Sequence, residues 1–111
     1  MDESGQVRDM VHVEDAASAI WAIARSTHIG PVNVASGVPV RVVDIAQEIA
    51  SIVGRAELLQ VGALPYRALE PPVLVADTTL LREAIGWSPR FDLRTGLEHT
   101  VEWWRASEAK L

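Results

Sequence analysis

Two features of the sequence predict a small domain of the α/β class (mixed α+β), with about four helices and several short strands. Apolar residues recur every three or four positions in separate stretches, as amphipathic helices require. Short β-prone runs precede these stretches, and glycine or proline separates the units. A chain of 111 residues can bury one hydrophobic core but not two, so residues 1–111 are predicted to form a single domain.

The first half of the chain is predicted to contain two units of a strand followed by a helix. A β-prone run at 10–13 precedes an amphipathic helix at 15–26. A buried strand is expected at 32–35, followed by a turn at Ser36-Gly37. Apolar residues then repeat at helical spacing from 42 to 53, and Gly54 stands where a helix C-terminal glycine belongs. The apolar face of the first helix is expected to carry Ala16, Ala17, Ile20, Ile23 and Ala24.

The second half is predicted to alternate extended and helical segments. Residues 57–61 are β-prone, 62–72 are expected to form an extended loop, and 73–75 a short strand. Asp77 and Thr78 can cap a helix that Gly86 ends. Asp92 can cap a last helix. The apolar positions of that last helix are Leu93, Leu97, Val101 and Trp104.

Composition argues against several classes of protein. The net charge is −5, and the nine arginines and one lysine form no basic run, so nucleic acid is not an expected partner. No stretch approaches the roughly 18 apolar residues of a membrane span. The absence of cysteine excludes disulfides and thiolate metal sites. With a polar N-terminal segment, a cytoplasmic location is the expectation.

Residue types that often carry chemistry show no catalytic or metal-binding spacing. His12, His28 and His99 are far apart in the sequence, so no metal site is predicted, and His12 is expected to be a structural histidine in a buried strand. Glu14 and Asp15 are adjacent and are expected to cap a helix and compensate its dipole. Ser36 is attributed to turn chemistry. Among the tryptophans, core packing is expected for Trp21, Trp87 and Trp104, while Trp103 lies on the neighbouring side of its helix.

Four segments in the same order resemble one enzyme family over almost the whole chain. They are Gln6-Val7-Arg8-Asp9-Met10-Val11-His12-Val13-Glu14-Asp15, then 32–37, then Ala76-Asp77-Thr78-Thr79 through Ile85-Gly86-Trp87-Ser88-Pro89, and finally 96–104. The chain is similar to extended short-chain dehydrogenases/reductases of the NAD-dependent epimerase/dehydratase type, such as the UDP-glucose 4-epimerase-like enzymes. The resemblance is to their C-terminal, substrate-binding lobe.

The resemblance implies a set of substrate-binding residues. Arg8 matches the family's arginine that contacts the substrate phosphates, and Gln6 matches a position that often assists it. Arg67 matches a second phosphate-contacting arginine. Glu70 matches a position that usually holds an aspartate bonded to the nucleotide ribose, from which it departs by one methylene.

The residues that perform the family's chemistry do not occur in this sequence. Hydride transfer requires a glycine-rich turn for NAD or NADP, and the seven glycines are never close enough together to form one. The family also uses a tyrosine with a lysine four residues later. The single tyrosine is Tyr66, and Glu70 stands four residues after it. No catalytic and no cofactor-binding residue is therefore predicted in this chain.

These observations lead to three hypotheses. The first is a truncated lobe that binds a nucleotide-diphosphate sugar weakly and is not catalytic on its own. The second is a non-catalytic module that forms a homo-oligomer through an exposed former domain interface. The third is a subunit that complements a separately encoded Rossmann half. No nucleic acid or membrane partner is expected.

Overall fold

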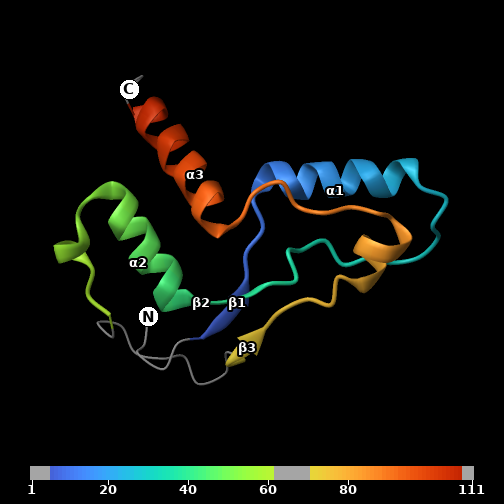
Figure 1. Cartoon of the computed structure of the whole chain (residues 1–111), viewed down its shortest axis with the longest axis horizontal. Helices are drawn as coiled ribbons and strands as arrows, with labels where there is room; N and C mark the ends of the chain where they lie inside the picture. Colours follow the sequence, from blue (N-terminus) through green and yellow to red (C-terminus); the bar gives the residue numbers. More distant parts are fainter. Residues whose placement is uncertain (1–5, 62–70, 109–111) are drawn as a thin grey trace.

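The fold is organised around a three-stranded sheet whose middle strand is β1 (Figure 1). The computed structural model describes residues 6–61 and 71–108, and it confirms the predicted mixed α/β class. In these residues the strands are β1 (Val7–Asp9), β2 (Pro39–Arg41) and β3 (Val73–Leu74); the helices are α1 (Val13–Arg25), α2 (Val42–Val53), α3 (Leu93–Glu108) and two short turns, η1 (Ala56–Leu58) and η2 (Leu80–Ala84).

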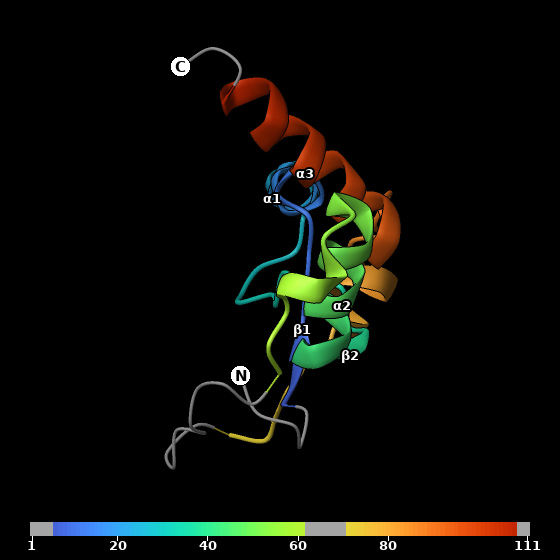
Figure 2. The same ribbon diagram turned by 90° about the vertical axis from the view of Figure 1, so that its left-hand side faces the viewer.

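Strand β1 is paired on both sides. It runs antiparallel to β2, with Val7 opposite Arg41, and parallel to β3, with Val7 opposite Val73. The backbone N–H of Val42, the first residue of α2, donates to the Gln6 carbonyl at 2.7 Å. Helices α2 and α3 pack side by side, and α1 lies apart from α2 (Figures 1 and 2). The segment just before β1 is thus tied to the start of α2.

In the described residues the strand predicted at 73–75 is present as β3, whereas the other predicted strands are displaced or absent. Residues 10–12 connect β1 to α1, and Val13 already begins the helix, so the first strand lies three residues earlier than predicted. Residues 32–35 form no strand, because within the described residues no neighbouring segment offers them a hydrogen-bond ladder. The prediction at 57–61 is also wrong, since η1 occupies its beginning. Most of the predicted loop at 62–72 lies outside the described residues.

The helix boundaries agree better with the sequence, because they depend on local chemistry. Gly54 ends α2 with a left-handed backbone (φ 79°), a conformation that glycine adopts without strain. The Asp92 carboxylate accepts the backbone N–H of Thr95 at 2.8 Å, which confirms it as a cap of α3. The predicted helix after Thr78 is a single π turn, η2. None of the helices in the described residues is long and apolar enough to cross a membrane.

A small core joins α1 to η2 and the segment after it. Ala19, Leu81 and Trp87 are its buried centre, and Leu81 is fully buried. The Trp87 Nε1–H donates to the Ser18 hydroxyl at 2.9 Å, so its one polar group is satisfied. The partly buried residues around this centre are Val11, Ala22, Ile23, Val32, Val34 and Ile85.

The buried face of α1 agrees only in part with the predicted one, because Ile23 packs against the core as predicted but its expected neighbours do not. The helix packs with Ala19, Ala22 and Ile23, whereas Ala17, Ile20 and Ala24 are exposed. Trp21 is 65% exposed and Trp104 is 59% exposed, so the prediction that both pack in the core is wrong, while that for Trp87 is confirmed. The prediction failed because α1 carries apolar residues on two sides, and only one side is covered in the described structure.

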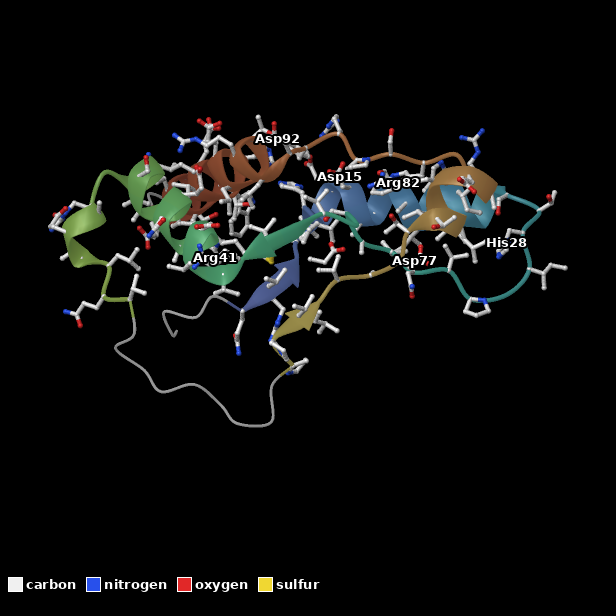
Figure 3. All side chains as sticks on the ribbon, turned by 60° about the horizontal axis from the view of Figure 1, so that its bottom comes forward. Asp15, His28, Arg41, Asp77, Arg82 and Asp92 are labelled. Atoms are coloured by element: carbon white, nitrogen blue, oxygen red, sulfur yellow. The ribbon has the colours of Figure 1, made fainter. Side chains whose placement is uncertain are left out.

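The Asp15 carboxylate fastens the segment before α3 to the start of α1 (Figure 3). Its side chain is buried and accepts the backbone N–H groups of Arg90 and Phe91, both at 3.0 Å. Asp15 lies in the first turn of α1, as predicted, where a negative charge also favours the helix dipole. Its second role, as a tertiary anchor, could not be predicted from the sequence.

Replacing Asp15 by alanine should destabilise the domain strongly. Two backbone N–H groups would lose a charged acceptor in a buried position, which costs about 2–4 kcal/mol in the free energy of unfolding. Urea unfolding followed by tryptophan fluorescence measures this loss. The control is Glu83→Ala, which removes an exposed carboxylate and should stay within about 0.5 kcal/mol. Equal stability of the two variants would contradict the anchoring role.

Candidate functional site

Two of the four substrate-binding residues that the family resemblance implies, Gln6 and Arg8, lie at β1. Gln6 directly precedes this strand and Arg8 lies within it, and positions two apart on an extended chain project to the same side. Both residues are half-buried. The Arg8 Nη1–H donates to the Val7 carbonyl at 2.8 Å, which engages one of the five N–H groups of the guanidinium. Arg67 and Glu70 lie outside the described residues and stay predictions.

Asp9, next to Arg8 and on the opposite side of β1, binds two loop segments. Its Oδ1 accepts the backbone N–H of Ser36 at 2.8 Å and the Ser36 hydroxyl at 2.7 Å. Its Oδ2 accepts the backbone N–H groups of Gly37 at 2.8 Å and of Ala76 at 3.4 Å. The Ser36 hydroxyl also accepts the Val38 N–H at 3.1 Å, which confirms its turn role. A single carboxylate therefore fixes the turn at 36–37 and the segment after β3 relative to β1.

The hydrogen bonds to Asp9 decide its ionisation. Burial by itself raises the pKa of this carboxyl, but the bonds from Ser36, Gly37 and Ala76 together lower the pKa below its ordinary value. The carboxylate form is thus favoured in the folded state. Gly37 is required beside it, because its φ is +74° and an added Cβ would lie 2.5 Å from the Thr78 hydroxyl oxygen.

A cavity of about 490 Å³ lies between the start of α1, the β1–β2 side of the sheet and the first half of α3. Its wall is mostly apolar. The polar groups that reach it come from His12, Asp15, Ser36, Arg90, Asp92 and Thr100; the apolar lining includes Met10, Val38, Val40, Phe91, Leu93 and Leu97. This cavity could not be predicted from the sequence, because its walls come from three segments that are distant in the chain.

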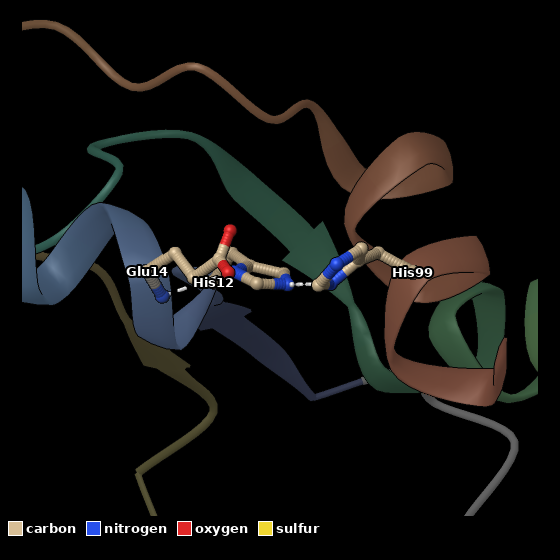
Figure 4. A group of neighbouring side chains, drawn as sticks. All are labelled: His12, Glu14 and His99. Carbon is tan, nitrogen blue, oxygen red and sulfur yellow. Dashed lines mark hydrogen bonds between the residues drawn. The ribbon is translucent and has the colours of Figure 1, made fainter. Parts of the chain in front are cut away.

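Two histidines that the sequence separates meet beside this cavity (Figure 4). His12 Nε2 lies 3.0 Å from His99 Nδ1, and His12 Nδ1 accepts the backbone N–H of Glu14 at 3.0 Å. The His12 ring stacks on Phe91 with centroids 4.0 Å apart. His12 is the N-cap of α1, so its predicted place in a buried strand is wrong, although the structure gives it a structural role. Pairing between α1 and α3 could not be predicted from spacing.

The donor atoms of His12, Glu14 and His99 lie within 4.8 Å of one another, which raises the question of a metal ion. The lone pairs of His12 Nδ1 and His99 Nδ1 are used in the two hydrogen bonds described above. The Glu14 carboxylate is paired with Arg90 at 2.7 Å. A metal on His12 Nε2 would require a hydrogen on Nδ1, facing the Glu14 N–H. The group is therefore better described as a hydrogen-bonded chain than as a set of ligands.

Comparison with known proteins points to one group of enzymes. No family model matches the chain. Over 103 residues the chain is 30% identical to the dTDP-4-dehydro-6-deoxy-D-allose reductase of Streptomyces bikiniensis. The aligned region covers 93% of this chain and 31% of that protein. The chain thus spans about a third of the length of the curated relatives that it matches.

Solved structures agree in fold and in coverage. The UDP-glucose 4-epimerase of Thermotoga maritima, determined with UDP-glucose, matches with a TM-score of 0.85 at 25% identity, over 96% of this chain and 34% of the other. The enzyme WbmF of Bordetella bronchiseptica, in complex with NAD+ and UDP, matches with a TM-score of 0.76 at 29% identity, over 97% of this chain and 32% of the other.

The stabilising effect of Asp9 should disappear in acid. Because the pKa is lower in the folded state, the contribution is complete above the unfolded value of about 3.9 and is lost as pH falls through the folded value. Urea unfolding from neutral pH to acid should show wild-type stability falling below about pH 4, while Asp9→Asn starts lower and changes less. Ser36→Ala, which removes one donor, should be intermediate. Parallel curves for wild type and Asp9→Asn would contradict this account.

Proposed function

We propose that this chain is the nucleotide-sugar-binding lobe of an NAD-dependent epimerase/dehydratase of the extended short-chain dehydrogenase/reductase type, because it aligns with about a third of the length of such enzymes. In this proposal it contributes phosphate contacts through Arg8, assisted by Gln6, and through Arg67, with Glu70 near the ribose. It performs no hydride transfer by itself. The nicotinamide cofactor would be held by residues other than those of this sequence.

The observation that supports this proposal most is the match to enzymes seen with nucleotide ligands. WbmF is known in complex with UDP, and the Thermotoga epimerase with UDP-glucose. Arg8 lies on the middle strand of the sheet, where pairing on both sides fixes its backbone. A guanidinium on a rigid strand suits a diphosphate, because its N–H groups match phosphate oxygens in a bidentate way.

The expected affinity is low because this chain corresponds to only about a third of the length of its relatives. The sequence contains neither a glycine-rich turn nor a tyrosine with a lysine four residues later. About two thirds of each relative is not matched, so much of a substrate cleft is expected to come from elsewhere. We therefore expect millimolar affinity for a nucleotide-diphosphate sugar.

Replacing Arg8 by alanine should weaken UDP binding by about tenfold, the effect of losing one charge-assisted contact. Chemical-shift titration of the labelled chain with UDP and UDP-glucose measures dissociation constants in the millimolar range. The matched control is Arg41→Ala, because Arg41 lies opposite Val7 in the antiparallel register and therefore faces the other side of the sheet from Arg8. Unperturbed spectra at millimolar UDP, or equal losses in both variants, would count against the proposal.

Self-association is a second candidate function, and the exposed side of α1 favours it. Val13, Ile20 and Trp21 are 76%, 60% and 65% exposed. With Ala17 and Ala24 they form one stripe at helical spacing, which we call the α1 stripe. Contiguous apolar surface of this kind usually marks an interface.

A second copy of this chain fits the α1 stripe when the two helices run antiparallel. Val13 then faces Ala24 of the partner subunit, and Ala17 faces Ile20 of the partner subunit, so large side chains meet small ones. The same arrangement places Glu14 near Arg25 of the partner subunit, and opposed helix dipoles add to this attraction. A contact about 20 Å long is small for a stable dimer, so association is expected to be weak.

Trp21→Glu should abolish this association, because a charge would replace the largest side chain of the α1 stripe. Size-exclusion chromatography with light scattering, over a range of concentrations, should show wild type shifting toward a dimer and Trp21→Glu remaining monomeric. Trp103→Glu is the control, since Trp103 is 58% exposed on α3. A wild type that is monomeric at every concentration excludes this candidate. Association only with a Rossmann protein bearing Tyr-x-x-x-Lys would favour a complementing subunit.

A further inference from the structure

The cavity of about 490 Å³ beside α3 is not used by the proposed nucleotide site. Its lining residues lie in three segments, 10–15, 36–40 and 89–100, and Arg8 is not one of them. Pockets that hold small organic molecules typically have volumes of about 300–1,000 Å³. The cavity is therefore large enough for a ligand of its own.

The wall of the cavity presents apolar side chains and one aromatic ring. Val40 and Leu97 are half-buried in it, and the ring of Phe91 lies between the sheet and α3 in the lining. Met10 and Val38 are also part of the lining, but they are 46% and 51% exposed. Large apolar side chains that stay exposed on a concave surface are typical of a binding site. An apolar ligand in the cavity would remove them from water.

The carboxylates and the arginine of the wall are already paired. Asp15 accepts two backbone N–H groups, and Asp92 accepts both the N–H and the hydroxyl of Thr95 at 2.8 Å. Arg90 is paired with Glu14 at 2.7 Å. The two aspartates stand at the starts of α1 and α3, so they also compensate the dipoles of these helices. A ligand ion would therefore lose its hydration without gaining a free counter-ion.

The uncharged polar groups of the wall are also hydrogen-bonded. Both ring nitrogens of His12 are engaged, and the Ser36 hydroxyl donates to Asp9 at 2.7 Å. The Thr100 hydroxyl donates to the Gly96 carbonyl at 2.8 Å, which leaves its oxygen able to accept a hydrogen bond. Among the described residues no buried side-chain nitrogen or oxygen lacks a hydrogen-bond partner. The wall thus asks for little polar contact from a ligand and has an acceptor for one hydroxyl at Thr100.

We propose that this cavity binds an uncharged, largely apolar molecule, namely an aromatic ring system that carries one hydroxyl group. The ring system lies against the apolar wall beside Phe91, and the Thr100 oxygen accepts the hydrogen of the hydroxyl group. A neutral ligand suits a wall whose charges are paired, because no unpaired ion is buried when it binds. This binding does not depend on nucleotide recognition at Arg8.

Three probes with the same ring system test the preference for a neutral ligand: 2-naphthylmethanol, the anion 2-naphthoate and the cation 2-naphthylmethylammonium. Chemical-shift titration of the labelled chain should give the alcohol a dissociation constant of about 0.1–1 mM and each ion at least about tenfold weaker binding. The largest shifts should occur at lining residues such as Met10 and Leu97. No binding of the alcohol, equal or tighter binding of an ion, or shifts centred on Trp21 in the α1 stripe would overturn the proposal.

Variants locate the site and separate it from the nucleotide site. Val38→Asp should weaken binding of 2-naphthylmethanol by about threefold or more, because a charge replaces an apolar contact at the rim. Val53→Asp is the matched control, since Val53 is 41% exposed at the end of α2 and does not line the cavity. Arg8→Ala should bind the alcohol as wild type does, whether or not the chain binds UDP. Equal losses in the two valine variants, or a loss in Arg8→Ala, would contradict a separate site in this cavity.

Discussion

The described structure depends on carboxylates that bind backbone N–H groups of distant segments. Asp9 fixes the turn at 36–37 and the segment after β3, and Asp15 fixes the segment before α3. These connections are needed because the apolar centre is small and Leu81 is its one fully buried large side chain among the described residues. A charged acceptor binds an N–H group about twice as strongly as a neutral one, and its geometry is fixed. Two aspartates therefore define the position of loops that the core does not reach.

The same arrangement connects the fold to the candidate binding site. Arg8 and Asp9 are neighbours on β1 and project to opposite sides of the sheet. Asp9 is held by loop backbone, which limits the movement of the strand and hence of the Arg8 backbone. Recognition of a diphosphate requires positively charged groups in defined positions, because binding energy is lost when flexible side chains have to be ordered. The anchoring carboxylate and the proposed ligand-binding arginine thus act through one short strand.

Predictions from the sequence succeeded where the chemistry is local. The cap by Asp92, the left-handed Gly54 and the turn at Ser36 each depend on residues within a few positions of one another. They failed where the outcome depends on distant partners. A strand at 32–35 requires a neighbouring strand, and the choice between two apolar sides of α1 depends on which side another element covers. The family resemblance named Gln6 and Arg8, but spacing could not bring His12 to His99 or form the cavity beside them.

Helix α1 explains why an uncovered surface remains. Ala19, Ala22 and Ile23 pack toward the core, while the α1 stripe carries Ile20 and Trp21 on another side. A helix that is apolar on most of its circumference is typical of a protein interior, not of a surface. Any partner that covers the stripe binds the folded chain and not the unfolded one, so it also stabilises the fold by mass action. Since Asp15 stands at the start of this helix, the core and the exposed stripe both depend on α1 remaining helical.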